Sequence, residues 1–428
     1  MKVPENSDAM QSPKERGRRK IGFAAGSVAI AILCLFIVFS PRHMVYDELA
    51  HISNVSEVHR IGWIATLTSA SNISAAGPLF TAIHLICEPW TKLSAPAIRL
   101  PNFILFIGLV LVLARTAQLL QLRDPALAAL SIIAVPFLWP AAGMALTEIP
   151  ALFCYAASVL VCVGVEQAGN RVSVARICLA LMGGILLGLA CLGRQTYLAT
   201  LLALPFLCRR ELKTWLSPAL IAFSALSVCG WLFWVWGGLI PPSLKANDAG
   251  LHYSHGVLSF SYLALATLFL APKWLLFEKG LSRKELVLIY AVGLGAAILT
   301  LAYPIAVIAP ARSLMERILT PSLFAWYPRV ISALLAGLAA IWLMKFAREL
   351  WLYRDQRVWL FIHLSLLVLA LTPIKISHQF SSRYVVTDIA LLVLLVWKRH
   401  DPISWVYGAR VAFGTFIGAM ILRTYFVQ

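Results

Sequence analysis

The chain has 428 residues, of which 60% are hydrophobic and 13% are charged, and its formal net charge is +17. Soluble domains carry about 25% charged residues, so this composition excludes an ordinary soluble protein and indicates a polytopic membrane protein. The positive charge does not indicate nucleic-acid binding, because Lys and Arg stand in short clusters between apolar runs rather than in one basic patch.

The first apolar run, residues 21–40, has about the length needed to cross a bilayer. Basic residues precede it, so we expect residues 1–20 to form a cytoplasmic basic tail. Apolar length and Lys/Arg flanks predict about 13 transmembrane helices. The predicted crossings are 21–40, 98–120, 125–144, 147–167, 176–193, 196–208, 216–239, 257–272, 286–309, 329–347, 358–374, 384–397 and 404–427. The expected fold is therefore an all-α polytopic membrane protein, with residues 21–428 as one transmembrane domain.

A long outer loop, residues 41–97, separates the first two crossings. Within it, residues 48–63 predict a juxtamembrane helix lying on the membrane surface, with Leu49, Ile52, Val55 and His59 on one side. Residues 77–90 are apolar but short for a crossing, so we expect them to stay in this outer loop. If they crossed, the later basic loops would face outward instead of inward.

The outer loop begins with two adjacent acids, Asp47 and Glu48. Acids this close to a membrane are costly unless they are solvated or used. One carboxylate could act as a general base, with its neighbour binding substrate or a metal. The ordinary alternative is a polar start of a loop, and the position alone does not decide between them.

Two further polar groups stand at outer helix ends. Arg194-Gln195-Thr196 interrupts an apolar stretch, and the fixed fork of an Arg suits phosphate; the alternative is an Arg that snorkels to the surface. Glu148 opens the fourth crossing, where the helix dipole alone would favour an acid. It could also reach the same cavity as Arg194.

A basic loop precedes the twelfth crossing. Lys375, His378, Arg383 and Tyr384 lie on the predicted outer side, against the positive-inside trend. An anion-binding cradle and a tolerated basic loop are both compatible with this pattern. Arg99 is a further outer cation, at the start of the second crossing.

These segments, in this order, resemble the GT-C superfamily of integral-membrane glycosyltransferases, including the dolichyl-phosphate-glucose glucosyltransferases, the protein mannosyltransferases and the aminoarabinose transferases. The resemblance spans roughly residues 21–210, with a thinner match beyond. Gly77 stands where the family has the first Pro of a Pro-Pro pair. The segments that carry the resemblance are Tyr46-Asp47-Glu48, Gly77-Pro78-Leu79-Phe80, Ile98-Arg99-Leu100-Pro101, Ala145-Leu146-Thr147-Glu148, Arg194-Gln195-Thr196 and Arg383-Tyr384.

The resemblance implies transfer of a sugar from a polyprenyl-phosphate donor to an acceptor hydroxyl, with inversion, at the outer or lumenal face. Asp47 would be the general base, and Glu48 would orient the acceptor or join a divalent metal such as Mg²⁺ or Mn²⁺. The implied phosphate-binding residues are Arg194, Arg383, Lys375 and His378, and the implied substrate-binding residues are Gln195, Glu148, Arg99 and Tyr384.

The expected partners are the lipid-linked donor, membrane lipids, and a glycan, lipid or protein acceptor, with no nucleic acid. Short loops favour a bacterial plasma membrane, with the endoplasmic reticulum as the alternative. The rival function is a polytopic transporter or flippase, which would also place charges in apolar helices. Against that rival, the sequence has no internal repeat, and its charges gather at outer helix ends.

Overall fold

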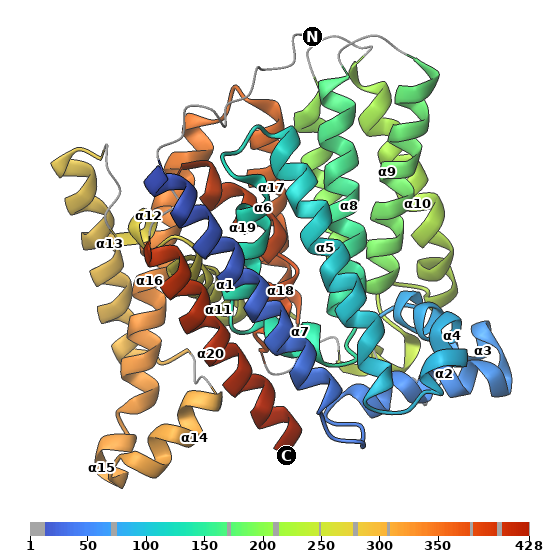
Figure 1. Ribbon diagram of the computed structural model, residues 1–428, viewed down its shortest axis with the longest axis horizontal. Helices are drawn as coiled ribbons and strands as arrows, with labels where there is room; N and C mark the ends of the chain where they lie inside the picture. The colour runs from blue at the N-terminus through green and yellow to red at the C-terminus, as the bar shows by residue number, and fades with distance from the viewer. Residues whose placement is uncertain are drawn as a thin grey trace.

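The structure is a computed structural model of the chain, and it describes residues 13–69, 75–168, 173–208, 214–247, 250–276, 281–305, 309–376, 380–399 and 405–427. Within these ranges the chain forms α-helices and 3₁₀ helices and no strand, which confirms the all-α fold (Figure 1). Ten helical segments of the described chain are long and apolar enough to cross a membrane. They confirm a polytopic membrane protein.

The ten long segments match ten of the thirteen predicted crossings. Their helices are α1 (Pro13–Val38), α5 (Leu100–Leu119), α8 (Glu148–Gln167), α9 (Val174–Gly193), α10 (Leu216–Trp236), α11 (Tyr253–Leu270), α13 (Arg283–Ala302), α16 (Tyr327–Leu352), α17 (Arg357–Leu371) and α20 (Trp405–Val427).

The other three predicted crossings are shorter or interrupted. The segment predicted at 125–144 is divided into α6 (Pro125–Leu130), η3 (Ser131–Ala134) and α7 (Leu138–Gly143). The break between η3 and α7 falls at Pro136, which lacks the N–H that would continue a helix. That at 196–208 is a 3₁₀ helix, η4 (Gln195–Leu207), and that at 384–397 is split into α18 (Arg383–Val386) and α19 (Ile389–Arg399). Most of 127–146 is buried inside the protein, where irregular backbone is tolerated at membrane depth.

The outer-loop helices gather at one end of the bundle, at the lower right in Figure 1. They are α2 (Glu48–Ile61), α3 (Trp63–Thr68) and α4 (Leu79–Thr91), followed by η2 (Ala97–Arg99). Helix α4 lies beside α2 at this end and is not among the ten long segments. We call this the loop end of the molecule.

The side of α2 that packs into the protein overlaps only in part with the side expected to lie on the membrane surface. Ile52 and Val55 are buried, whereas Leu49 is 65% exposed and the His59 side chain 57% exposed. The buried side instead carries Glu48 and His51. The helix turns its acid inward because Glu48 has a buried cationic partner, described below, and an apolar periodicity cannot reveal that partner.

Small residues allow a close backbone contact between α9 and α10. On α9, a Cβ added at Gly184 would lie 2.3 Å from the Ile221 carbonyl oxygen of α10, and one at Gly188 would lie 2.8 Å from that of Ala225. This spacing of two glycines by four residues lets membrane helices approach backbone to backbone. The packing fixes the end of α9, where Arg194 follows.

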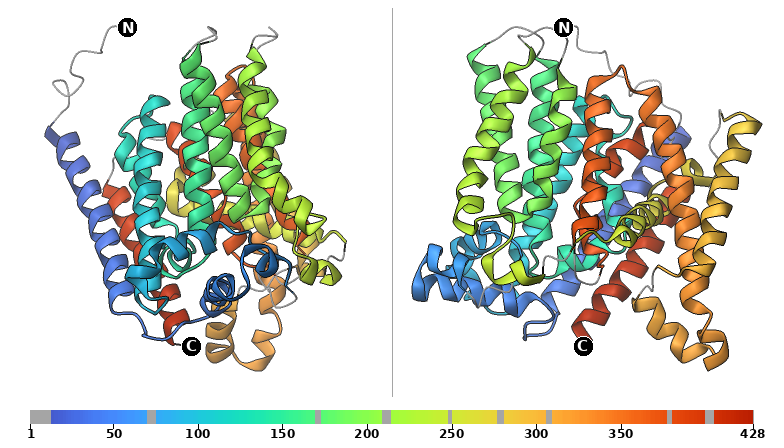
Figure 2. Two further views of the ribbon diagram at one scale, coloured as in Figure 1. Left: turned by 90° about the vertical axis from the view of Figure 1, so that its right-hand side faces the viewer. Right: turned by 180° about the vertical axis from the view of Figure 1, so that it is seen from behind.

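The remaining elements complete the bundle. Helices α1 and α20 lie side by side, and α13 packs on α16 at the edge of the molecule, as both figures show (Figures 1 and 2). The short elements are η6 (Pro242–Asn247), α12 (Pro272–Leu276), α14 (Ala309–Ile318), α15 (Pro321–Phe324) and η7 (Thr372–Lys375).

Candidate active site

The two acids at the start of α2 point into different surroundings. Glu48 has no exposed surface, and its carboxylate accepts hydrogen bonds from the Arg99 Nε (2.8 Å) and Nη2 (2.7 Å). It also accepts the backbone N–H groups of Val45 and Ala145, each at 2.9 Å. Four donors therefore surround the Glu48 carboxylate. The geometry makes it an anchor for the chain segment that presents Asp47.

Arg99 is also fully buried. Its Nη1 donates to the Ser40 hydroxyl (2.5 Å) and the Pro41 carbonyl (2.9 Å), and its Nη2 to the His43 carbonyl (3.0 Å) as well as to Glu48. A guanidinium has five N–H donors, and these contacts use all five. The structure thus gives Arg99 a role in tying the end of α1 to the start of α5, in place of the expected substrate contact.

Asp47 joins a chain of alternating charges that we call the ionic cluster: Asp47, Arg383, Glu148 and Arg194. Arg383 donates from Nη1 to Asp47 Oδ2 (2.5 Å) and from Nε to Glu148 Oε1 (2.8 Å). Arg194 Nη2 also donates to Glu148 Oε1. The four residues stand at the ends of α2, α18, α8 and α9. The fold therefore brings together, at the loop end, side chains that lie up to 336 positions apart in the sequence.

Exposure divides the ionic cluster into an inner and an outer part. Glu148 is completely buried, and the side chains of Arg383 and Arg194 are 9% and 16% exposed. The Asp47 side chain is 45% exposed. A buried charge is stable only when it is paired, and here two acids balance two guanidinium groups. Asp47 is therefore the carboxylate of this cluster that an incoming molecule can reach.

Polar atoms without a partner gather around the inner part of the cluster. Native proteins pair nearly all buried polar atoms, so several unpaired ones in one place indicate a position for water or a polar ligand. Among the described residues, the buried atoms here that have no hydrogen-bond partner are Glu148 Oε2, Thr147 Oγ1, Arg194 Nε, Thr196 Oγ1 and His51 Nε2.

Two buried histidines lie between the cluster and α4. Burial, with Arg383 as the second cause, lowers the pKa of His51 to about 4, and burial with His51 lowers the pKa of His84 to about 4. The Phe80 ring lies 5.4 Å from the His51 ring and 4.1 Å from the His84 ring, centroid to centroid. Both histidines are therefore neutral at neutral pH, and they add no positive charge to the cluster.

Gln195 holds the outer-loop segment before α4 against the turn after α9. Its side-chain amide donates to the Ala75 carbonyl. Two residues later, a Cβ on Gly77 would lie 2.3 Å from the Leu192 carbonyl oxygen, so only glycine fits there.

The predicted site residues of the loop before α19 lie in different surroundings. Tyr384 is half-buried next to Arg383, with its ring 5.9 Å from the Phe380 ring. Lys375 is exposed at the end of η7. His378 lies outside the described residues.

Sequence reasoning gave no role to His51 or Tyr425. His51 stands four positions after Asp47, so helical spacing could have placed both on one side of α2. Tyr425 lies near the end of the last helix, and no sequence pattern connects it to the site.

The described residues do not fit the expected divalent metal. They contain no group of three or more His, Cys, Asp or Glu side chains that could hold a metal ion. The Glu48 carboxylate is occupied by four donors, and Glu148 faces two guanidinium groups.

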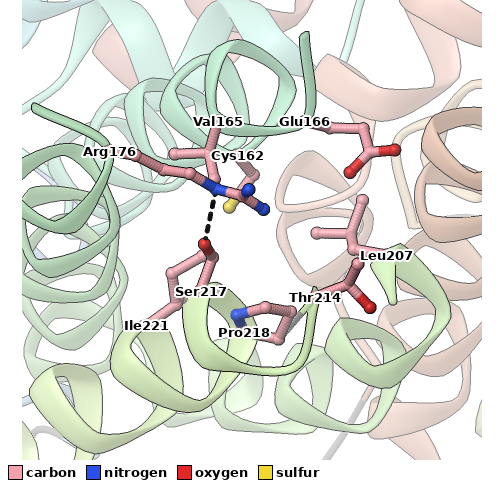
Figure 3. A pocket seen from close by; sticks show the side chains of 9 residues that line it. All are labelled: Cys162, Val165, Glu166, Arg176, Leu207, Thr214, Ser217, Pro218 and Ile221. Atoms are coloured by element: carbon pink, nitrogen blue, oxygen red, sulfur yellow. Dashed lines mark hydrogen bonds between the residues drawn. The ribbon is translucent and has the colours of Figure 1, made fainter. Parts of the chain in front are cut away.

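A cavity at the other end of the bundle is separate from the ionic cluster (Figure 3). It has a volume of about 10 Å³, and its polar wall includes Arg176, whose Nε donates to the Ser217 hydroxyl at 2.9 Å. Glu166 also lines it, 18 residues along α8 from Glu148, which corresponds to roughly 27 Å of helix. The cavity has room for about one water molecule, so it is no substrate site.

Fold and site together define an all-α polytopic membrane protein with an ionic cluster at one end of its helix bundle. No protein-family model and no curated sequence matches the chain significantly. Among solved structures, it is similar to the archaeal oligosaccharyltransferase AglB from Archaeoglobus fulgidus in complex with an inhibitory peptide and a dolichol-phosphate. The identity is 16% and the TM-score 0.48, covering 94% of this chain and 56% of that one.

It is also similar to ArnT from Cupriavidus metallidurans in the apo state. Here the identity is 16% and the TM-score 0.44, and the match covers 93% of this chain and 77% of that one. The chain thus spans about half the length of the archaeal enzyme. Similarities of this size do not assign an activity.

Proposed function

We propose that this protein is a membrane glycosyltransferase of the GT-C type, which transfers a sugar from a polyprenyl-phosphate donor to an acceptor hydroxyl. The observation that carries the proposal is the half-exposed Asp47 carboxylate, which pairs with Arg383 at the loop end, where Arg383 and Arg194 share Glu148. A base next to guanidinium groups is the combination that attack on a sugar phosphate requires. The ordered motifs of the sequence support the same class.

Arg194 and Arg383 are the proposed phosphate-binding residues. Their planar forks match phosphate oxygens, and both are held in place by Glu148. Lys375 and His378, in the segment before Arg383, would add positive charge near the arriving phosphate. Glu148 is then a positioning residue, because it orients both guanidinium groups and has no exposed surface.

The proposed reaction is a single displacement. Asp47 accepts the proton of the acceptor hydroxyl, and the hydroxyl oxygen forms a bond to the anomeric carbon. The bond between that carbon and the phosphate oxygen breaks, and the polyprenyl phosphate leaves with the electron pair. The guanidinium groups stabilise the charge that develops on the phosphate. Attack opposite the leaving group inverts the anomeric configuration.

Orientation and location follow from the distribution of charge. Most Lys and Arg residues flank the helix ends opposite the loop end, so the positive-inside rule puts the ionic cluster on the outer or lumenal face. We propose a bacterial plasma membrane, with the cluster facing the periplasm or exterior. There it would meet lipid-linked donors and an acceptor glycan, lipid or protein.

A donor screen tests the proposal. Purified protein would receive several polyprenyl-phosphate sugars with candidate acceptors, and released polyprenyl phosphate would be measured. Asp47→Asn should lower the transfer rate by about 10²–10⁴ and the melting temperature only slightly, because Asp47 is half-exposed and Arg383 keeps Glu148 as a partner. Asp355→Asn, which changes an acid whose side chain is 87% exposed at the opposite end, is the matched control. Transfer at the normal rate by Asp47→Asn would remove Asp47 from catalysis, and movement of a lipid without chemical change would establish a transporter.

A further inference from the structure

Three tyrosines lie next to the exposed part of the ionic cluster. The Arg383 guanidinium lies over the Tyr46 ring at 5.5 Å, and the Tyr46 ring meets the Tyr425 ring edge-on at 5.2 Å. Tyr384 directly follows Arg383 in the chain, and its ring lies 5.9 Å from the Phe380 ring. The three tyrosines come from the outer loop, α20 and α18, so the rings converge from separate parts of the chain.

Tyr46 adopts an unfavourable backbone conformation. Its φ of 52° lies in the left-handed region, which residues other than glycine adopt rarely. Its ring is nevertheless 54% exposed, so hydrophobic burial gives little in return. Strain that persists at a position beside a candidate base is a reason to look for a functional constraint. In this case the constraint is the placement of a ring directly beside Asp47.

Tyr425 brings the last helix into the site. Its ring is half-buried, and its phenol lies within electrostatic range of Tyr46, Arg383 and Asp47. Packing alone would be satisfied by a phenylalanine at this position, so the hydroxyl of Tyr425 indicates a further role. A phenol that is neutral at physiological pH can donate and accept hydrogen bonds without competing with the guanidinium groups for phosphate.

We propose that Tyr46, Tyr384 and Tyr425 form the subsite for the sugar ring of the donor. This rests on the proposed function. A pyranose or furanose ring has an apolar C–H face that packs on an aromatic ring, and hydroxyls that hydrogen-bond to phenols; Tyr offers both. With its phosphate at Arg194 and Arg383, the donor would have its sugar between these rings and its anomeric carbon near Asp47. The chemical class is an uncharged, hydroxylated sugar ring.

Paired lipids separate this subsite from the phosphate site. Binding of a short polyprenyl phosphate would be measured in detergent, beside the same lipid carrying glucose, galactose, mannose or arabinose. For its preferred sugar, the wild type should bind the sugar-loaded lipid about tenfold more tightly. Tyr425→Ala should lose that gain and bind the sugar-free lipid as before, and Tyr425→Phe should retain part of the gain. Tyr303→Ala, a 71% exposed tyrosine just after α13, is the matched control and should change neither affinity.

The outcomes distinguish the two proposals. Asp47→Asn should keep the sugar-dependent gain while transfer is lost. If Tyr425→Ala binds both lipids in the wild-type ratio, or if no sugar improves binding to the wild type, the subsite is wrong and the rings are interfacial anchors. A wild type that binds neither lipid would overturn the proposed function as well.

Discussion

At the scale of single residues, adjacent acids in the sequence have unequal tasks in the structure. Asp47 is half-exposed and pairs with one guanidinium group, whereas Glu48 is buried among four donors. A carboxylate must be reachable to accept a proton from a substrate. Glu48 therefore acts through the position of Asp47, and the two acids should fail in different ways when they are changed.

Glu48→Gln should destabilise the protein. It leaves Arg99 as a buried charge without its counterion, and removing one partner of a buried pair costs about 3–5 kcal/mol. Thermal unfolding in detergent would measure the loss, and the remaining folded fraction should keep most of its transfer rate. A variant with an unchanged melting temperature and no transfer would show that Glu48 takes part in the chemistry.

Acid should weaken the fold through His51 and His84. Their pKa is about 4 in the folded protein and about 6.5 in an unfolded chain, so the unfolded chain binds these protons more readily. The free energy of unfolding therefore has its full value above about pH 6.5. It decreases as the pH is lowered from 6.5 to 4, by about 3 kcal/mol for each histidine.

Melting temperatures at pH 7 and pH 4.5 would measure this effect. His84→Leu should have a smaller decrease in melting temperature between the two pH values than the wild type. Carboxylates that titrate in the same range affect both proteins equally and cancel in this comparison. An equal drop in both proteins would mean that His84 is protonated without cost.

Residue types and positions predicted much of the ionic cluster. Asp47, Glu148, Arg194 and Arg383 each stand at the end of an apolar segment on one predicted side, so a common site was a reasonable expectation. The full use of Arg99 could not be predicted, because two of its five hydrogen bonds go to backbone carbonyls that any sequence would offer.

At the scale of elements, hydropathy located the long helices and missed the breaks between short ones. Residues 125–143 are apolar throughout, but they pack inside the protein and are not limited to one continuous helix. Apolar length alone cannot separate a lipid-facing helix from buried irregular chain. The contact between α9 and α10 shows the opposite case, where a four-residue glycine spacing is readable in sequence.

Gly184→Ala should damage that contact. The new Cβ would lie 1.8 Å from the Ser224 hydroxyl and 2.3 Å from the Ile221 carbonyl, so α9 and α10 must separate, at a cost of roughly 1–3 kcal/mol. Because Arg194 follows α9, transfer should also fall. Gly164→Ala is the matched control, since nothing lies within 4 Å of its added Cβ, and it should be neutral or gain up to about 1 kcal/mol. Equal melting temperatures for the two variants would mean that α9 and α10 are not in tight contact.

At the scale of the whole molecule, the ends of distant helices meet on one side. The ionic cluster joins the residue before α2, the first residue of α8, the residue after α9 and the first residue of α18. This arrangement requires that α4 does not cross the membrane, because a crossing there would reverse every later helix relative to Asp47. The orientation of the loop end is therefore the property on which the proposed function depends most.

Single cysteines in a background without the eight native ones would test that orientation. Arg42→Cys, at an exposed position before α4, and Trp90→Cys, at an exposed position in the last turn of α4, should both react with an impermeant maleimide in intact cells. Asp355→Cys, in the exposed turn between α16 and α17, should react only after permeabilisation. If Arg42→Cys and Trp90→Cys react from opposite sides, α4 crosses the membrane. If the whole pattern is inverted, the ionic cluster faces the cytoplasm, where it would meet nucleotide-activated sugars rather than an outer-leaflet lipid donor.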